Sequence, residues 1–291
     1  MQEIIGKAGT LLEALPYIQR FRGETFVVKY GGSFMDSPDP AERHRVAREI
    51  VFLEAVGINP VVVHGGGKAI TRALEAAGLA GDFVQGQRAT TREAMEVVER
   101  VLSREINPEI VAAIRELGGE AQSFAGSDIF RCRKLEVRDE AGQPLDLGYV
   151  GEVYAVETDA LRDCIWRNIT PVISPTARGD DGMIYNCNAD IGAAQTAIAL
   201  KARRLVFMSD VAGLLRDQND NSSLVSHLAV ADVPQLKEAG VIDRGMIPKV
   251  DSAVAAIRSG VEKVQFVDGR IPHSVLLEIF TDAGVGTEVV L

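Results

Sequence analysis

The chain has 291 residues, of which 46% are hydrophobic and 25% are charged, a balance typical of a globular protein with a buried core. Its 41 acidic residues outnumber the 31 basic ones, and a surface with a formal net charge of −10 repels nucleic-acid phosphates and anionic lipids. We therefore expect neither nucleic acid nor membrane as a partner, and we expect any anionic substrate to be met by local cations.

The three cysteines, Cys132, Cys164 and Cys187, lie far apart in the sequence and form no C-x-x-C pair. This spacing predicts neither a disulfide framework nor a zinc site, and it favours a reducing, cytoplasmic location. Charged residues interrupt the first apolar stretch, and no run approaches the roughly 20 apolar residues of a membrane span. We predict no signal peptide and no transmembrane helix.

The first 20 residues predict an amphipathic helix, with apolar side chains at helical spacing. These are Ile4, Ile5, Ala8, Leu11, Leu12, Leu15 and Ile18. Pro16 should kink this helix, because proline lacks the N–H donor and clashes with the preceding turn.

After Gly23, short apolar runs alternate with longer amphipathic stretches. The predicted strands are Thr25–Tyr30, Pro60–His64, Pro171–Ser174, Arg204–Met208 and Lys263–Val267. The predicted helices are Glu42–Val56, Lys68–Gly78, Arg92–Leu117, Asp159–Asn168, Ala189–Ala202, Val233–Ala239 and Lys249–Ser259. This alternation predicts an α/β fold: a three-layer sandwich whose central sheet is mainly parallel. Residues 131–157 break the rhythm and resemble an inserted antiparallel hairpin.

Familiar nucleotide-binding motifs are absent from the sequence. Gly65-Gly-Gly-Lys68 is followed by alanine and does not fit the G-x-x-x-x-G-K-[ST] loop, no G-x-G-x-x-G follows a strand, and the H-R-D and D-F-G motifs of protein kinases are missing. The missing dinucleotide fingerprint disfavours an oxidoreductase.

Two predicted strands run directly into glycines. Lys29-Tyr-Gly-Gly32 ends the first, and His64-Gly-Gly-Gly-Lys68 ends the second. Ligands of open α/β sheets sit beyond the carboxyl ends of strands, where glycines let backbone N–H groups approach an anion. Lys29 fits a surface turn equally well. His64 is best interpreted as a structural residue at a strand end, since nothing pairs it with a nucleophile.

Three further motifs place charges beside predicted helix starts or loops. They are Asn186-Cys-Asn-Ala-Asp190, Gly245-Met-Ile-Pro-Lys249 and Gln85-Gly-Gln-Arg88. Alone, Asp190 could simply stabilise a helix start and Lys249 could be solvated. Arg88 could clamp a carboxylate or be exposed.

Together with Ser209-Asp-Val-Ala-Gly-Leu214, these motifs resemble the amino-acid kinase family in order and spacing. Within that family the chain resembles the members that phosphorylate N-acetyl-L-glutamate in arginine biosynthesis, from about residue 10 to the end. Phe83-Val-Gln-Gly-Gln-Arg88 and the segment from Asp268 to Thr287 carry the finer resemblance.

The resemblance implies an ATP-dependent kinase that converts the side-chain carboxylate of N-acetyl-L-glutamate to an acyl phosphate. Lys29 and Lys249 would stabilise the transferring phosphoryl group, with Asp190 between them. Substrate would contact Gly65, Gly66, Arg88 and Asn186, and nucleotide would contact Gly31, Gly32, Asp210, Val211, Gly213 and Leu214. Mg²⁺ would be held mostly by ATP and water, so no protein ligand is assigned.

The same resemblance implies three parts and a regulated assembly. Residues 1–20 would be an oligomerisation helix, residues 21–200 the acyl-substrate lobe, and residues 201–291 the nucleotide lobe. Arginine would inhibit allosterically through Tyr17, Lys201, His273, Glu278 and Gly286, in a hexamer built as a trimer of dimers.

Some segments depart from the family pattern, namely Gln87, Ser103-Arg-Glu105 and Ser123-Phe-Ala-Gly-Ser-Asp128. They surround the expected acceptor site. A kinase of carrier-linked aminoadipate or glutamate therefore stays an alternative, as does a catalytically silent arginine sensor.

Overall fold

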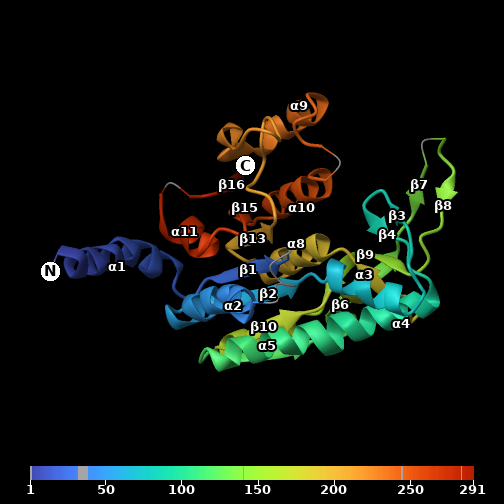
Figure 1. The fold of residues 1–291 in the computed structure, drawn as a ribbon, viewed down its shortest axis with the longest axis horizontal. Helices are drawn as coiled ribbons and strands as arrows, with labels where there is room; N and C mark the ends of the chain where they lie inside the picture. Colours follow the sequence, from blue (N-terminus) through green and yellow to red (C-terminus); the bar gives the residue numbers. More distant parts are fainter. Residues whose placement is uncertain (1, 32–38, 140, 244, 283) are drawn as a thin grey trace.

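The computed structural model describes residues 2–31, 39–139, 141–243, 245–282 and 284–291, arranged as a sheet between layers of helices (Figure 1). The strands of the main sheet are β1 (Thr25–Tyr30), β2 (Asn59–His64), β5 (Ala121–Phe124), β10 (Thr170–Ile173), β13 (Arg204–Ser209), β14 (His227–Ala229), β15 (Lys263–Asp268) and β16 (Thr287–Val290). The other strands are β3 (Phe83–Val84), β4 (Gln87–Arg88), β6 (Phe130–Lys134), β7 (Val137–Arg138), β8 (Pro144–Leu145), β9 (Val150–Val156), β11 (Thr176–Gly179) and β12 (Ile184–Cys187).

The α-helices are α1 (Gln2–Phe21), α2 (Pro40–Ala55), α3 (Gly67–Ala76), α4 (Arg92–Glu99), α5 (Asn107–Glu116), α6 (Gly126–Ile129), α7 (Asp159–Trp166), α8 (Ala189–Leu200), α9 (Val233–Glu238), α10 (Ile247–Arg258) and α11 (Ser274–Phe280). A π-helix, η2 (Arg100–Ile106), joins α4 to α5, and two 3₁₀ turns are η3 (Asn221–Ser223) and η4 (Val230–Asp232). All five predicted strands and all the predicted helices are present within a few residues of the expected bounds.

The main sheet has eight strands in the order β14-β16-β15-β13-β1-β2-β10-β5. Six of them, from β15 to β5, run parallel, and β16 pairs antiparallel with β15. The parallel pair of β1 and β13 lies in the middle, so one continuous sheet extends through both predicted lobes. The predicted mainly parallel α/β fold is confirmed.

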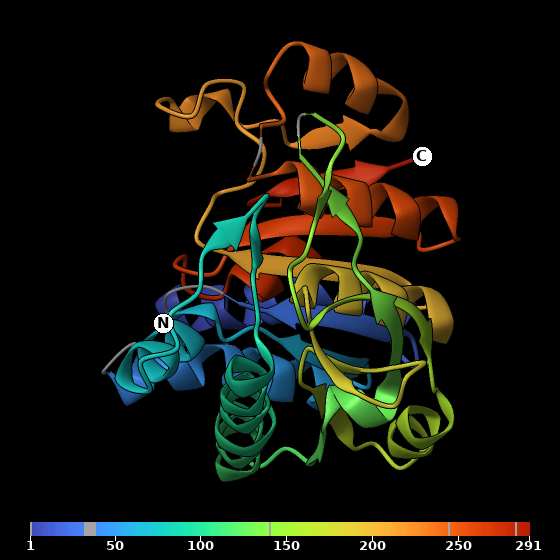
Figure 2. The same cartoon turned by 90° about the vertical axis from the view of Figure 1, so that its right-hand side faces the viewer.

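The two faces of the sheet bury alternate residues of each strand, as the pleat requires. On one face, Val27 and Val63 pack with residues of α8 and α10. On the other face, Phe26 and Val62 pack with residues of α2, α5 and α11. The chain therefore forms the three-layer sandwich that the sequence predicts, seen from a second side in Figure 2.

The segment predicted as one helix, Arg92–Leu117, is helical from Arg92 to Glu116, but its middle is the π-helix η2. Such wide turns often occur beside functional sites. Just after it, the buried side chain of Asn107 donates from Nδ2 to the carbonyl oxygens of Phe124 (3.3 Å) and Val172 (2.9 Å). These bonds fix the π-helix against the carboxyl ends of β5 and β10.

The predicted hairpin in residues 131–157 is present as β6 and β9, which pair antiparallel. The sequence did not indicate that β11 and β12 join them to close a small barrel. Two further hairpins, β3–β4 and β7–β8, extend beside the barrel (Figure 1).

Helix α1 continues through Pro16 and projects from the body of the molecule (Figure 1). Among the described residues, no helix combines the length and apolar character needed to cross a membrane.

Candidate active site

Three charged side chains from distant parts of the chain meet beside the carboxyl end of β1. Lys29 comes from β1, Asp190 from the first turn of α8 and Lys249 from the first turn of α10. Asp190 Oδ1 lies 3.2 Å from Lys29 Nζ, and Asp190 Oδ2 accepts a hydrogen bond of 2.6 Å from Lys249 Nζ. The structure thus brings together the three residues predicted to be catalytic.

Burial makes this cluster electrostatically strong, because Lys29 and Asp190 are only 8% and 7% exposed. Burial alone would raise the pKa of Asp190, but the attraction of Lys29 and Lys249 outweighs it and lowers that pKa to about 2. Burial lowers the pKa of Lys29, and Asp190 offsets part of that shift. One carboxylate therefore holds two cations side by side, where a transferring phosphoryl group would need them.

The glycine loops lie next to this cluster. A Cβ on Gly65 would be 3.7 Å from the Cα of Gly31, so the ends of β1 and β2 approach closely. The Gly65 N–H donates to the Tyr30 carbonyl (2.7 Å), which leaves Gly66 as the better placed of the two predicted N–H donors to substrate. Gly32, a predicted nucleotide contact, lies outside the described residues.

Arg88 lies on β4 with its guanidinium beside the same loop. Its Nη2 donates to the Thr71 hydroxyl (2.6 Å) and to the Gly67 carbonyl (3.2 Å). Its guanidinium carbon lies 4.4 Å from the centroid of the Phe83 ring. Thr71 and Phe83 therefore orient Arg88. No sequence motif pointed to Thr71.

Asn186 lies on β12, in the small barrel, where it pairs with Val150 of β9 and Thr176 of β11. The predicted nucleotide segment follows β13. Val211 is exposed there, whereas the Leu214 side chain is buried and its N–H donates to Thr287 Oγ1 (2.9 Å). The carbonyl of Leu214 accepts from the Val225 N–H (2.8 Å), so both backbone polar groups of Leu214 are engaged within the protein.

Two of the three departures from the family pattern, Ser103–Glu105 and Ser123–Asp128, meet at Ser174, just beyond β10. The hydroxyl of Ser103 lies 2.8 Å from the hydroxyl of Ser174, which also accepts a bond from the Gly126 N–H (2.9 Å). A Cβ on Gly126 would be 2.0 Å from the Ser174 carbonyl oxygen. This contact requires glycine at position 126.

Three of the five predicted arginine-site residues, Tyr17, Glu278 and Gly286, line a cavity of about 250 Å³ between α1, α11 and the β14–β16 edge. The other two are not among its lining residues: Lys201 ends α8 in a left-handed conformation, and His273 precedes α11. The cavity is lined instead by the cationic side chains of Arg20, Arg204 and Lys263, which were not predicted from the sequence.

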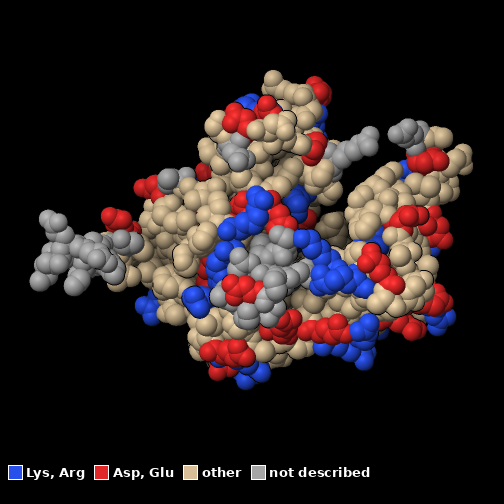
Figure 3. Space-filling view, viewed as in Figure 1, with Lys and Arg blue, Asp and Glu red and all other residues tan. Residues whose placement is uncertain are grey.

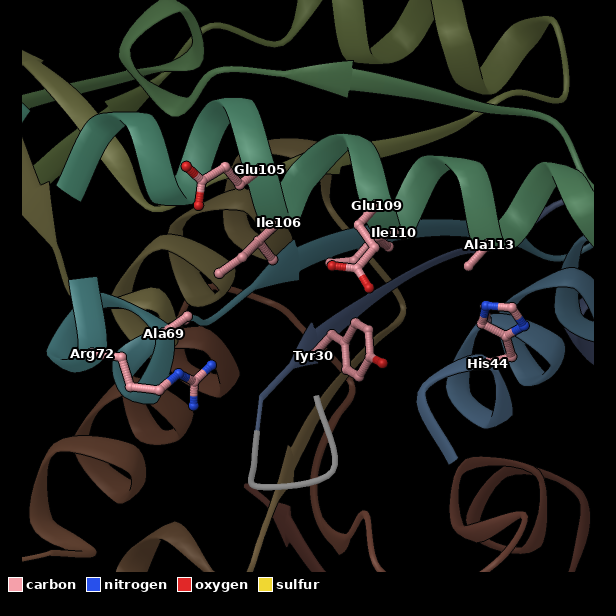
Figure 4. Close-up of a pocket in the computed structure, with 11 residues that line it drawn as sticks. Tyr30, His44, Ala69, Arg72, Glu105, Ile106, Glu109, Ile110 and Ala113 are labelled. Carbon is pink, nitrogen blue, oxygen red and sulfur yellow. The ribbon is translucent and has the colours of Figure 1, made fainter. Parts of the chain in front are cut away.

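A second cavity, of about 280 Å³, is lined by Tyr30, Gly66 and residues of α2, α3, η2 and α5 (Figure 4). Arg72 of α3 and Tyr30 of β1 line it from one side. Glu105 of the π-helix η2 and Glu109 of α5 also line it. Lysine and arginine side chains also gather near the middle of the face in Figure 3, although the chain carries a net charge of −10. The local cations that an anionic substrate requires are thus present.

The sequence pattern that defines the Amino acid kinase family matches residues 24–268. The chain belongs to the amino acid kinase family. The match covers the strands and helices that place Lys29, Asp190 and Lys249, so the predicted family is confirmed.

Curated relatives in this family align along nearly the whole chain. A protein of Heliobacterium modesticaldum named acetylglutamate kinase is 47% identical, with 99% of each chain covered. The protein of the same name from Geobacter sulfurreducens is 45% identical, with 99% of each chain covered. That from Akkermansia muciniphila is 44% identical, with 99% of this chain and 96% of the other covered.

Solved structures confirm the amino acid kinase fold. N-acetylglutamate synthase from Neisseria gonorrhoeae, in complex with coenzyme A and N-acetyl-glutamate, superposes with a TM-score of 0.84 at 24% identity. The alignment covers 98% of this chain and 63% of that longer one. The carbamate kinase of Giardia has a TM-score of 0.64 at 14% identity, with 92% of this chain and 99% of that chain covered.

Proposed function

We propose that this kinase transfers the γ-phosphoryl group of ATP to the side-chain carboxylate of N-acetyl-L-glutamate, forming an acyl phosphate. The observation that carries the proposal is the buried Lys29–Asp190–Lys249 cluster beside the Gly65–Gly66 loop. Relatives that are 44–47% identical over nearly the whole chain bear the name acetylglutamate kinase, and this supports the choice of acceptor.

The composition of the cluster suits a carboxylate acceptor. A side-chain carboxyl has a reference pKa of about 4.3, so it is already ionised at neutral pH and needs no general base. The barrier lies in bringing one anion against another, and fixed cations with oriented N–H groups lower that barrier. Asp190 is held as an ion pair by two lysines, which makes it a positioning group rather than a base.

Arg88 is our proposed contact for the α-carboxylate of the acceptor. Its guanidinium is preoriented by Thr71 and Phe83 and lies beside the glycine loop, where the acceptor's reactive end must also be. We assign the remaining polar contact to Asn186, on the wall of the small barrel.

We assign ATP to the end of the sheet beyond β13 and β15, with residues 21–200 as acceptor lobe and residues 201–291 as nucleotide lobe. Among the described residues, no group of three or more His, Cys, Asp or Glu side chains is arranged to hold a metal ion. We expect a magnesium ion to enter on the phosphates of ATP and to supply charge neutralisation. The lysines of this chain would supply the remaining positive charge.

We also propose that arginine inhibits the kinase from the cavity beside α11. The carboxylates of Glu278, Asp282 and Glu288 line it and can pair with a guanidinium, while Arg20 and Lys263 can meet an α-carboxylate. None of its lining residues belongs to the Lys29–Asp190–Lys249 cluster, so inhibition from this cavity would be allosteric.

Helix α1 supports a hexameric assembly, as a trimer of dimers. Leu11 and Leu12 are 69% and 68% exposed on the projecting helix, whereas Tyr17 and Ile18 nearer its end pack on the core. An exposed apolar stripe needs a second surface, and a neighbouring subunit would provide it. We place the enzyme in the cytoplasm, where the buried thiols of Cys132, Cys164 and Cys187 would stay reduced.

The test is turnover of purified protein with ATP, magnesium and a panel of acidic acceptors, with hydroxylamine to trap the acyl phosphate. N-acetyl-L-glutamate should be the preferred acceptor without any carrier protein. Turnover only of carrier-linked aminoadipate or glutamate would replace the acceptor. Arginine binding with no turnover of any acceptor would indicate a silent sensor.

A further inference from the structure

His64 occupies a position whose role the cluster of lysines does not explain. It is the last residue of β2, directly before Gly65 and Gly66. Its backbone is in register with Tyr30 on the neighbouring parallel strand. Because successive side chains point to opposite faces, His64 and Tyr30 share one face of the sheet, and Lys29 projects from the other.

The His64 ring makes one hydrogen bond, which fixes its tautomer. Its Nδ1 lies 2.7 Å from the carbonyl oxygen of Gly65. A carbonyl oxygen only accepts hydrogen bonds, so Nδ1 carries the proton. The ring is fully buried, and burial lowers its pKa to about 4, although the bond to Gly65 works in the opposite direction. The imidazole is therefore neutral at physiological pH and has no proton on Nε2.

Nε2 of His64 is buried and has no hydrogen-bond partner among the described residues. An unpaired buried polar atom lowers the stability of the fold, because its lost contacts with water are not replaced. An apolar residue of similar size would avoid this cost but could not donate to Gly65. The hydrogen bond from Nδ1 is thus the feature of this side chain that an apolar replacement could not supply.

The geometry of the peptide bond connects this hydrogen bond to the active site. The C=O and the N–H of a trans peptide point in opposite directions. With the Gly65 carbonyl directed to the His64 ring, the N–H of Gly66 is directed away from that ring. His64 lies on the face of the sheet opposite Lys29, so we infer that this N–H is directed to the side of Lys29.

Side chains of the π-helix η2 pack directly against Gly66 and leave no room for a side chain on this residue. A Cβ on this residue would be 2.7 Å from both Leu102 Cδ2 and Ile106 Cδ1. The Gly65 N–H is held by Tyr30, so the loop is fixed at both glycines. The remaining N–H of Gly66 also belongs to the residue that precedes α3, where the helix dipole favours negative charge.

We propose that His64 is a positioning residue whose Nδ1–H holds the Gly65 carbonyl, so that the Gly66 N–H is aimed at the phosphoryl group during transfer. The inference rests on the proposed kinase reaction and deepens it. His64 exchanges no proton with substrate, and its contribution is the fixed orientation of one peptide plane.

Three substitutions separate this role from simple packing. In His64→Asn, the side-chain nitrogen can occupy the place of Nδ1 and donate to Gly65. In His64→Gln, the nitrogen lies nearer the place of Nε2, and in His64→Leu there is no donor at all. His64→Gln and His64→Leu should lower kcat on the order of 100-fold, the scale for one lost transition-state donor, while KM for both substrates changes less than about threefold. His64→Asn should retain most of the wild-type rate.

Melting temperatures and ATP affinity serve as folding controls for the three variants. A wild-type kcat in all three variants would overturn the proposal. So would an equal loss of kcat in His64→Asn and His64→Leu at equal melting temperature. A second measurement needs no variant: ¹⁵N NMR of histidine-labelled wild-type protein should show His64 with its proton on Nδ1. A proton on Nε2 would overturn the proposal even if every variant failed to fold.

The proposed reaction and the role of His64 can fail separately. If wild-type protein does not phosphorylate N-acetyl-L-glutamate but accepts another acid, the acceptor is wrong and the same variants are compared on that acid. If no acceptor is phosphorylated, the kinase proposal is wrong. The proposed role of His64 in orienting the Gly66 N–H toward a phosphoryl group is then wrong as well. The NMR experiment still decides whether the hydrogen bond exists.

Discussion

The carboxylate of Glu49 accepts a hydrogen bond of 3.1 Å from the backbone N–H of Val275 and so joins α2 to the first turn of α11. Glu49 is almost fully buried. Burial raises its pKa to about 7, although the backbone bond to Val275 and the nearby Arg45 lower it in part. A contact between the predicted acceptor lobe and the predicted nucleotide lobe thus depends on a carboxyl group that titrates near neutral pH.

This raised pKa predicts a loss of stability as pH rises. A carboxyl that is protonated in the folded state stabilises the fold fully below its unfolded pKa of about 4.5, and that contribution disappears as pH rises through about 7. The difference between pKa values of about 4.5 and about 7 corresponds to about 3 kcal/mol. Glu49→Gln, whose oxygen can still accept from Val275, should remove this part of the pH dependence. The free energy of unfolding, measured with urea at pH 5 and pH 8, tests this, and Glu152→Gln at an exposed position is the control. An identical pH dependence of the free energy in wild type and Glu49→Gln would contradict the assignment.

Replacing either lysine of the cluster should affect turnover more than binding. Lys29→Ala and Lys249→Ala remove a cation that matters most as charge develops on the phosphoryl group, so kcat should fall on the order of 10²–10³-fold. KM for N-acetyl-L-glutamate should change much less. Steady-state kinetics with both substrates varied provides the measurement. Near-normal kcat in either variant would show that its lysine has another role.

Removing the guanidinium of Arg88 should weaken acceptor binding. Arg88→Ala loses a charge-assisted contact to the α-carboxylate, worth roughly 1.5–3 kcal/mol, while ATP affinity should stay nearly constant. Thr71→Val should have a smaller effect in the same direction, because it removes only the 2.6 Å bond that orients the guanidinium. Calorimetric titration compares these variants with the exposed Arg92→Ala. An unchanged acceptor affinity in Arg88→Ala would place the α-carboxylate elsewhere.

Deleting residues 1–20 should leave an active dimer with a weakened response to arginine. The deletion removes exposed Leu11 and Leu12 together with Tyr17, which lines the cavity beside α11. Light scattering and inhibition curves on full-length and truncated protein measure the two effects. A full-length dimer that millimolar arginine does not inhibit would reject the regulatory proposal and leave the kinase proposal intact.

Local patterns were sufficient to predict the elements of the sheet. Val27 and Val63 belong to short apolar runs that end in glycine, and these runs form β1 and β2 almost as predicted. Both strands are buried on two faces, and this requires a continuous apolar sequence that can be recognised without any partner. The order of the motifs likewise indicated the family, because each motif is a local sequence.

Contacts between distant residues were decided by tertiary structure alone. The family resemblance implied that Asp190 lies between Lys29 and Lys249, but only the packing of α8 against β1 and α10 shows the contacts. The small barrel was missed because β11 and β12 are four-residue strands, and the pairings that close the barrel join them to the distant strands β6 and β9.

The contacts of Gly286 and His64 in the structure changed the interpretation of both residues. Gly286 was selected for an arginine site, but a Cβ there would also be 1.9 Å from the Phe266 carbonyl oxygen, so the packing of the backbone itself requires glycine. His64 was interpreted as a satisfied strand-end residue, yet its Nε2 has no partner among the described residues. Hydrophobic periodicity depends on neighbours along the chain, and so the sequence by itself determined the strands, the helices and the family. The partners of a buried charge or ring depend on which distant segments pack against it, and only the tertiary structure decided them.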